Sequence, residues 1–151
     1  MRDIDGPYIG TLMRVCWQWM HEQTYSALVE MGYTDLSPAL ISVFRYPTPD
    51  GVRPSELAER LQVTRQSVND LLRDLEQVGY LTREQVPGDG RARVVRLTSD
   101  GKRLERAVSQ ELRRAEQRMA QILGADRFAD YRKMTIEIVE TLTGRDVFSI
   151  S

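Results

Sequence analysis

Apolar side chains recur at helical spacing along most of the chain and give way to a strand-like composition over one short stretch. The helical spacing predicts helices over residues 8–31, 38–46, 54–61, 65–78, 99–122 and 126–142. Residues 80–86 and 93–98 are rich in strand formers, and the turn sequence VPGDGRA joins them, which predicts a β-hairpin. The expected fold is therefore mainly α with a small β-hairpin (α+β), with about six helices.

Residues that favour helix ends mark several of these boundaries. Ser37 precedes a proline and is expected to cap the second helix, and Thr64 and Thr98 are expected to cap the helices that follow them. Gly79 follows the fourth helix where a left-handed backbone is usual. The sequence PTPDGVRP, residues 47–54, predicts a loop because its prolines and its Asp-Gly pair interrupt helical structure.

The long helices at the two ends of the chain differ in the partners that their apolar faces predict. The first helix has apolar residues on more than one side, so it needs two partners, which we expect to be its own domain and a second chain. The fifth helix presents one apolar face, made of Leu104, Val108, Leu112, Ala115, Met119 and Ile122. The last helix is expected to turn five residues inward: Phe128, Tyr131, Met134, Ile138 and Leu142.

The middle of the chain has the order of elements typical of a helix-turn-helix. Two short helices flank the tight turn Gln62-Val63, and the hairpin follows directly, so residues 38–98 are predicted to form a winged helix-turn-helix. The second of these helices buries one face, made of Val68, Leu71, Leu72, Leu75 and Val78.

The polar side of that second helix carries candidate DNA-binding residues. Arginine pairs with guanine in the major groove, and glutamine or asparagine pairs with adenine. The spacing places Arg65, Gln66 and Asn69 together toward a groove, and Asp70 either accepts from cytosine or holds Arg73 in place. A solvated helix face would show the same residues. The candidates for the major groove are Arg65, Gln66, Ser67, Asn69 and Arg73.

The tip of the predicted hairpin is charged and has no apolar residue to pack. An arginine in a narrow minor groove meets an enhanced negative potential, so Arg91 is a candidate for minor-groove binding, with Arg93 nearby. Asp89 is placed to orient the guanidinium of Arg91. A solvated turn is the alternative interpretation of this sequence.

Composition and charge exclude several other classes of protein. The chain has 151 residues, of which 41% are hydrophobic and 28% charged, which indicates a single globular domain over residues 1–151. The formal net charge is -1, but residues 53–106 hold 11 basic and 9 acidic residues and are the only third with a basic excess. One cysteine and one histidine exclude an internal disulfide and a zinc site built from several such ligands, and no cofactor or metal is expected.

The sequence also predicts the cellular location of the protein and argues against an enzyme. No apolar run reaches the roughly 18 residues that a membrane span needs, and the first ten residues lack the apolar core of a signal peptide. We therefore expect a cytoplasmic protein without membrane association. An enzyme is not expected, because a nucleophilic triad would need His21 within a helix and no nucleophile elbow, phosphate loop or metal spacing occurs.

Residues 56–101 resemble the DNA-binding core of MarR-type bacterial transcriptional regulators. The resemblance rests on ELAERL at 56–61, on the helix ending from Leu72 to Leu81, on the pair Asp89 and Arg91, and on Leu97, Thr98 and Gly101. The length of the chain and its long flanking helices fit the same family.

The resemblance implies an obligate homodimer that binds pseudo-palindromic promoter DNA, most often as a repressor. It implies dimerisation through residues 8–31 together with 99–142. It places Arg65, Gln66, Ser67 and Asn69 in the major groove, Arg73 near phosphate, and Arg91, braced by Asp89, in the minor groove. A small ligand or an oxidant would weaken DNA binding from a site where the dimer helices meet the DNA-binding lobe.

A ligand-responsive switch is one expectation from the first 46 residues, where most aromatic residues lie. A pocket lined by Trp17, His21 and Tyr25, with Arg14 or Arg45 for an anion, would hold a small aromatic acid. Plain packing in the core and at the dimer contact is the alternative for the same side chains.

Two further alternatives complete the predictions. Some MarR-like repressors sense peroxides through an N-terminal cysteine, for which Cys16 is the candidate, although alignment through Tyr25 would place the sensing residue near Thr11. A lone cysteine among apolar residues is more often a buried small hydrophobe. A winged helix used only for protein contacts is the second alternative, against which the charged wing argues because a protein-binding wing would expose apolar residues.

Overall fold

The structure is a computed structural model that describes residues 6–45 and 48–144. These residues form α1 (Ile9–Glu30), α2 (Pro38–Ile41), the 3-10 helix η1 (Ser42–Phe44), α3 (Pro54–Leu61), α4 (Arg65–Gln77), β1 (Leu81–Val86), β2 (Asp89–Leu97), α5 (Ser99–Leu123) and α6 (Ala125–Thr143). β1 and β2 pair as an antiparallel hairpin. The predicted fold class is confirmed.

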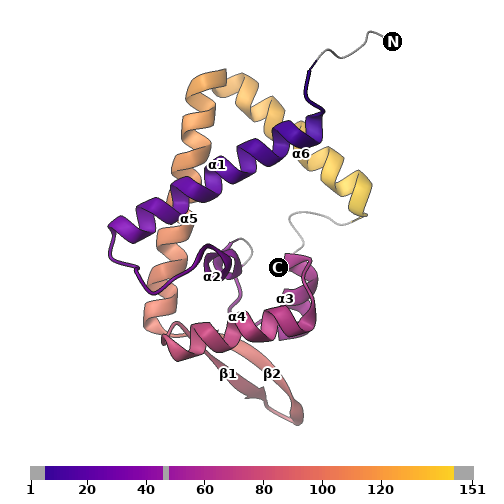
Figure 1. Cartoon of the computed structure of the whole chain (residues 1–151). Coiled ribbons are helices and arrows are strands. Elements are labelled where there is room, and N and C mark those ends of the chain that lie inside the picture. The colour runs from indigo at the N-terminus through magenta and orange to yellow at the C-terminus, as the bar shows by residue number, and fades with distance from the viewer. Residues whose placement is uncertain (1–5, 46–47, 145–151) are drawn as a thin grey trace.

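The elements gather at two ends of the molecule that α5 connects (Figure 1). α2, α3, α4 and the hairpin lie at one end, which we call the lobe. At the other end α1 crosses α5, and the chain reverses at Gly124 into α6. The hairpin extends from the lobe on the side of α4, away from α1 and α6.

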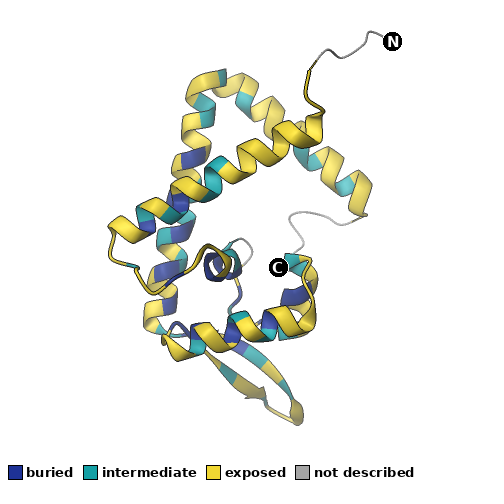
Figure 2. Ribbon diagram, in the orientation of Figure 1, coloured by how far each residue is buried: buried dark blue, intermediate teal, exposed yellow. Residues whose placement is uncertain are grey.

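The buried core lies inside the lobe and reaches only part of the way along α1 and α5 (Figure 2). The side chains with an exposed fraction of 0% are Leu28, Val68, Leu72, Leu75, Val95, Leu104 and Val108. Each contributes roughly 1.5–3 kcal/mol when it leaves water. The lobe therefore has its own hydrophobic core, to which the C-terminal end of α1 and the N-terminal half of α5 are attached.

The predicted helix caps are confirmed. Ser37 Oγ accepts from the backbone N–H of Leu40 at 3.3 Å, and the hydroxyl oxygen of Thr64 accepts from the backbone N–H of Ser67 at 3.0 Å. Thr98 caps α5 by accepting from the N–H of Gly101 at 3.1 Å. Each cap satisfies a backbone donor that the first turn of a helix leaves unpaired.

The predicted loop after the second helix contains a strand-like segment that the sequence pattern did not indicate. Gly51 donates its N–H to the carbonyl of Val95 at 2.7 Å, and Val95 donates to the carbonyl of Val52 at 2.9 Å. The carboxylate of Asp50 accepts from the N–H of Leu97 at 2.9 Å. Residues 50–52 thus cover the outer edge of β2 at the base of the hairpin.

Several predicted boundaries and faces differ from the structure. The second helix, expected over 38–46, is α-helical only to Ile41 and then tightens into η1, and position 46 lies outside the described residues. Val78 and Ile122, expected on the apolar faces of their helices, have exposed fractions of 39% and 82%, because Val78 lies at the C-terminal end of α4 and Ile122 at the end of α5 away from the lobe.

The largest difference concerns α6, which has no buried residue in this single chain. Its expected inward face is instead exposed: Met134 by 55%, Ile138 by 50% and Leu142 by 80%. The helical spacing is apolar as predicted, but no element of the described chain covers it.

Candidate nucleic-acid interface and ligand cluster

The first turn of α4 presents exposed polar side chains in a fixed backbone frame. Arg65, Gln66 and Ser67 are all exposed. The cap residue Thr64 lies 2.8 Å from the hydroxyl of Ser67, so that hydroxyl is engaged. Arg65 and Gln66 make no side-chain hydrogen bond to any described residue, which leaves both free to reach outward from a helix N-terminus, where anions are also favoured.

Asn69 lies differently from the expectation that it would face outward with Arg65 and Gln66. It is half-buried. Its amide nitrogen donates to the carbonyl of Arg65 at 2.9 Å, and its amide oxygen accepts from Arg83 at 3.4 Å. The side chain therefore points along the helix and toward β1, because two protein partners satisfy it there.

Arg73 is held by Asp70, one of the two roles considered for that carboxylate. The guanidinium and carboxylate are 3.0 Å apart, and both side chains are more than half exposed. Exposed pairs of this kind contribute at most about 1 kcal/mol. Arg73 can therefore exchange Asp70 for a phosphate oxygen at little cost.

In the hairpin tip Asp89 braces the backbone and not the guanidinium of Arg91. Its carboxylate accepts from the backbone N–H groups of Arg91 and Ala92, both at 3.2 Å. Gln85 donates across the hairpin to the carbonyl of Gly90 at 3.4 Å. The tip is thus a hydrogen-bonded turn that leaves the side chains of Arg91 and Arg93 exposed.

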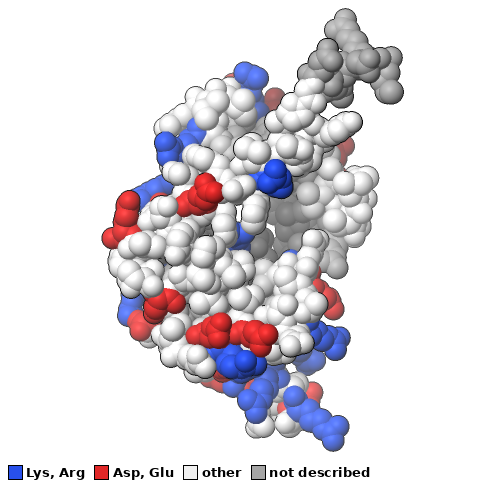
Figure 3. Space-filling model, viewed as in Figure 1, with Lys and Arg blue, Asp and Glu red and all other residues white. Residues whose placement is uncertain are grey.

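Positive charge concentrates where these elements meet. Figure 3 shows Lys and Arg gathered at the end of the molecule formed by α4 and the hairpin, whereas Asp and Glu lie mainly above them in this view. A charged end of this kind favours contact with phosphates even though the net charge is close to zero.

Sequence reasoning missed Arg83 and Glu76, which join β1 to α4. The guanidinium of Arg83 meets the Glu76 carboxylate at 2.9 Å through Nε and at 2.6 Å through its terminal nitrogen. The signal was available, because Gly79 reverses the chain between helix and strand and places residues on its two sides face to face.

A second cluster forms where α1 meets the chain after η1. The rings of Trp17 and His21 stack with centroids 5.1 Å apart, and the guanidinium carbon of Arg45 lies 5.3 Å from the Trp17 ring centroid. Three of the five residues expected in an effector site are therefore together. Arg14 is exposed and contacts no described side chain by hydrogen bond or ion pair, and Tyr25 packs against the core.

Two nitrogen atoms in this cluster are buried without a hydrogen-bond partner among the described residues. They are Nδ1 of His21 and Nε of Arg45. Burial lowers the pKa of the Arg45 guanidinium from its ordinary value. A half-buried cation whose buried Nε has no acceptor among the described residues favours the arrival of an anion.

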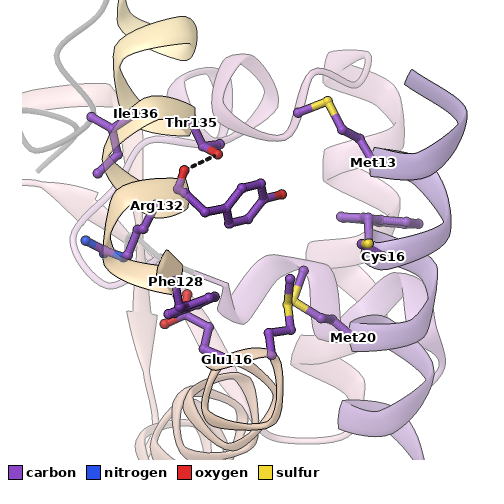
Figure 4. Close-up of a pocket in the computed structure, with 11 residues that line it drawn as sticks. Met13, Cys16, Met20, Glu116, Phe128, Arg132, Thr135 and Ile136 are labelled. Atoms are coloured by element: carbon purple, nitrogen blue, oxygen red, sulfur yellow. Dashed lines mark hydrogen bonds between the residues drawn. The ribbon is translucent and has the colours of Figure 1, made fainter. Parts of the chain in front are cut away.

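A mostly apolar groove of about 700 Å³ separates α1 from α5 and α6 (Figure 4). Met13, Cys16 and Met20 line it from α1, and Phe128 and Ile136 line it from α6. Cys16, expected to be a buried small hydrophobe, is exposed in this chain. Two charged residues also line the groove, Glu116 from α5 and Arg132 from α6, and the guanidinium of Arg132 points away from α1 (Figure 4).

Neither a metal centre nor a membrane segment occurs in residues 6–45 and 48–144. No group of three or more His, Cys, Asp or Glu side chains there is arranged to hold a metal ion. None of the described helices is both long and apolar enough to cross a bilayer.

The fold and the exposed polar helix define a winged helix-turn-helix protein. Two short helices meet at the left-handed Gln62, α4 exposes its N-terminus, and the hairpin follows with arginines at its tip. This order is that of DNA-reading proteins that place one helix in the major groove.

Comparison with known proteins agrees with this class and narrows it. Residues 44–92 match the sequence profile of the MarR family. The HTH-type transcriptional repressor Rv2887 of Mycobacterium tuberculosis is 27% identical over 130 residues, which are 86% of this chain and 91% of the repressor. The chain is thus similar to MarR-family regulators over residues 44–92 and to a transcriptional repressor over most of its length.

Two solved structures show the same fold. The complex of M. tuberculosis Rv2887 with salicylic acid has a TM-score of 0.67 and 25% identity and covers 89% of this chain and 98% of its own. The Staphylococcus aureus MepR–DNA complex has a TM-score of 0.73 and 21% identity and covers 91% of this chain and all (100%) of its own.

Proposed function

We propose that this protein is a transcriptional repressor that binds pseudo-palindromic promoter DNA as a homodimer and leaves it when a small aromatic anion binds. One observation carries the DNA-binding part. Arg65 and Gln66 extend from the N-terminus of α4 without a side-chain hydrogen bond to any described residue, and the hairpin that carries Arg91 and Arg93 lies at the same end of the molecule as α4 (Figure 1). The similarity to the repressor Rv2887 and the DNA complex of MepR support the same assignment.

Fluorescence anisotropy with the duplex immediately upstream of the protein's own gene tests the proposal. We expect tight binding that resists competitor DNA and weakens steeply as salt rises, because phosphate contacts release counter-ions. Weak binding of every duplex alike would contradict a promoter-specific regulator. No binding at low salt would favour a winged helix that contacts only proteins.

Arg91→Ala is expected to weaken promoter binding about tenfold or more, since a groove-reading arginine supplies roughly 1–3 kcal/mol. The backbone of the tip should persist, because Asp89 braces main-chain N–H groups. Anisotropy measures the loss, with Arg113→Ala, an exposed arginine on α5, as the control. Equal affinities for the two variants would remove the wing from the interface.

The exposed apolar faces of α1 and α6 support the homodimer. Ile9 is 71% exposed, Leu12 46% and Ile138 50%, and apolar side chains exposed in groups on a stable protein mark a protein interface. Glu116 and Arg132 line the groove beside them, and neither forms an ion pair with a described residue. In a two-fold interface Glu116 of one chain can face Arg132 of the second chain and the reverse, so a second copy of this chain can pair both residues.

The ligand part rests on the cluster of Trp17, His21 and Arg45. A flat ring above it would continue the stack, and a carboxylate would accept from the unpartnered Arg45 Nε. The similarity to Rv2887, whose structure contains salicylic acid, points to the same ligand chemistry. The cluster connects α1 to Arg45, which follows η1 at the edge of the lobe. A ligand bound at this junction can therefore shift the lobe relative to the dimer helices.

Arg45→Met is expected to raise the salicylate concentration needed for DNA release about tenfold or more, since a hydrogen bond to a charged group contributes about 1.5–3 kcal/mol. Affinity for the promoter without salicylate should stay close to wild type. Release is followed by anisotropy. Arg14→Met is the control, because Arg14 lies on the same helix as Trp17 but forms no hydrogen bond or cation–π contact with the cluster. Impaired release in the Arg14 variant alone would move the anion site to that residue.

A further inference from the structure

The side chain of Arg83 ties the wing to the recognition helix at two points. It lies on β1, and its guanidinium holds the carboxylate of Glu76 near the end of α4, with 23% and 28% of the two side chains exposed. Its other terminal nitrogen donates to the amide oxygen of Asn69, two turns earlier on the same helix, at 3.4 Å. Arg83 therefore contacts α4 along much of its length.

Asn69 extends this connection to the first turn of α4. Its amide nitrogen donates to the carbonyl of Arg65 at 2.9 Å. The orientation of the amide is determined by its partners, because a guanidinium only donates and a carbonyl only accepts. An unbroken hydrogen-bonded path thus runs from the wing strand through Arg83 and Asn69 to the residue that begins the helix.

Few other contacts hold the outer part of the wing in place. Beyond Leu81 no residue of β1 is buried, and residues 89–94 of β2 are exposed or half-buried. Residues 50–52 cover β2 only at its base. The orientation of the tip relative to α4 consequently depends on polar contacts across the interface between β1 and α4, and the contacts through Arg83 are the ones that join the two elements by hydrogen bonds.

We propose that Arg83 is a positioning residue for DNA recognition, which acts through Glu76 and Asn69 to set the angle between the wing and α4. The inference rests on the proposed DNA binding. Groove contacts need side chains held within about 0.5 Å of their productive geometry. With Arg83 in place, Arg91 and the first turn of α4 meet the two grooves at the same time. Asn69 is part of this frame and does not read a base.

Arg83→Met and Arg96→Met are the matched pair for the test. Each removes one positive charge from the hairpin, so general attraction to phosphate falls equally. Arg83 pairs with Val95 in the hairpin register and Arg96 with Thr82, so the two arginines lie on opposite faces. Arg96 forms an exposed pair with Glu84 at 3.5 Å and does not contact α4.

The probe is a duplex that the wild-type protein selects from a random pool, compared with a scrambled duplex of the same composition. We expect Arg83→Met to reduce the ratio of the two affinities about tenfold, a size typical of coupled neighbours. Arg96→Met should lower both affinities alike and keep the ratio. Arg83→Lys should give an affinity ratio between those of Arg83→Met and the wild type. A lysine keeps the positive charge but cannot bind Glu76 and Asn69 at the same time, as the guanidinium does.

A double-mutant cycle with Arg91→Ala gives a readout that a purely structural role would not change. If Arg83 positions the wing, Arg91→Ala costs clearly less affinity in the Arg83→Met protein than in the wild type. An Arg91 effect of equal size in both backgrounds, together with an unchanged ratio, would overturn the proposal. Should Arg83→Met melt at a much lower temperature, Glu76→Gln makes the same test, because it keeps the shape of the side chain and removes its charge.

Failure of the proposed function looks different from failure of this inference. A wild-type protein that selects no duplex contradicts the DNA-binding proposal itself. A wild-type protein that selects a duplex, with Arg83 and Arg96 variants that behave alike, contradicts only the positioning role of Arg83.

Discussion

Gly101→Ala is expected to destabilise this chain by about 3 kcal/mol or more, the upper range for overpacking a core, although alanine favours helices more than glycine does. A Cβ on Gly101 would overlap the carbonyl oxygen of Tyr80 and lie 3.0 Å from its carbon. That carbonyl accepts from the N–H of Thr98, whose hydroxyl in turn donates to the carbonyl of Gly79 at 2.7 Å. Backbone atoms so connected cannot move aside as a flexible side chain would.

Urea unfolding followed by circular dichroism measures the effect on Gly101→Ala. Gly10→Ala is the matched control, because Gly10 lies in α1 and a Cβ there meets nothing within 4 Å. The control should be as stable as the wild type or more stable by up to about 1 kcal/mol. An equally stable Gly101 variant would mean that α5 can move away from Tyr80 without loss.

Ile138→Asp is expected to convert the proposed dimer into folded monomers and with it to abolish tight promoter binding. The change places a carboxylate on the exposed apolar face of α6, and an unpaired charge in a closed interface costs several kcal/mol. Because about 1.4 kcal/mol corresponds to a factor of ten, dimer affinity should fall roughly a hundredfold or more. Because Ile138 is 50% exposed within one chain, the lobe should keep its fold.

Sedimentation equilibrium measures the mass of the Ile138 variant. Ala129→Asp adds the same charge to α6 at an exposed position on its other side, so that protein should stay dimeric. Dimers of equal strength in both variants would show that α6 does not form the interface.

The sequence pattern was sufficient where a local rule determines the structure. Thr64 and Thr98 cap their helices as predicted, and Gly79 has the expected left-handed backbone, with φ at 84°. These outcomes depend on a few neighbouring residues. The same locality explains why α3, α4 and β1 could be located within one residue of their ends, whereas β2 begins at Asp89, four residues before the predicted start of the second strand.

The pattern was insufficient where distant residues compete for a side chain. Asn69 has outward helical spacing, yet Arg83, 14 residues later, draws it inward. Asp89 was expected to hold a guanidinium and instead accepts two backbone N–H groups, which are nearer and fixed. Arg45 could not be placed beside Trp17 without knowing how η1 returns the chain to α1.

The apolar face of α6 shows a different limit. Its spacing indicates correctly that Ile138 and Leu142 belong on one face, but periodicity does not distinguish a chain's own core from a partner's surface. The exposure of that face in one chain is what separates the two cases.

The segment at 50–52 divides the wing into two parts with different motion. At the base, the Val95 amide hydrogen and carbonyl are both bound by that segment, so exchange of this hydrogen with solvent requires the loop to detach from β2. Toward the tip, the backbone is held by the opposite strand and by the Asp89 carboxylate, and opening there needs no such detachment. Amide hydrogens at the base of the wing are therefore expected to exchange more slowly than those at its tip, so that the point of attachment stays in register with the rest of the lobe when the tip opens.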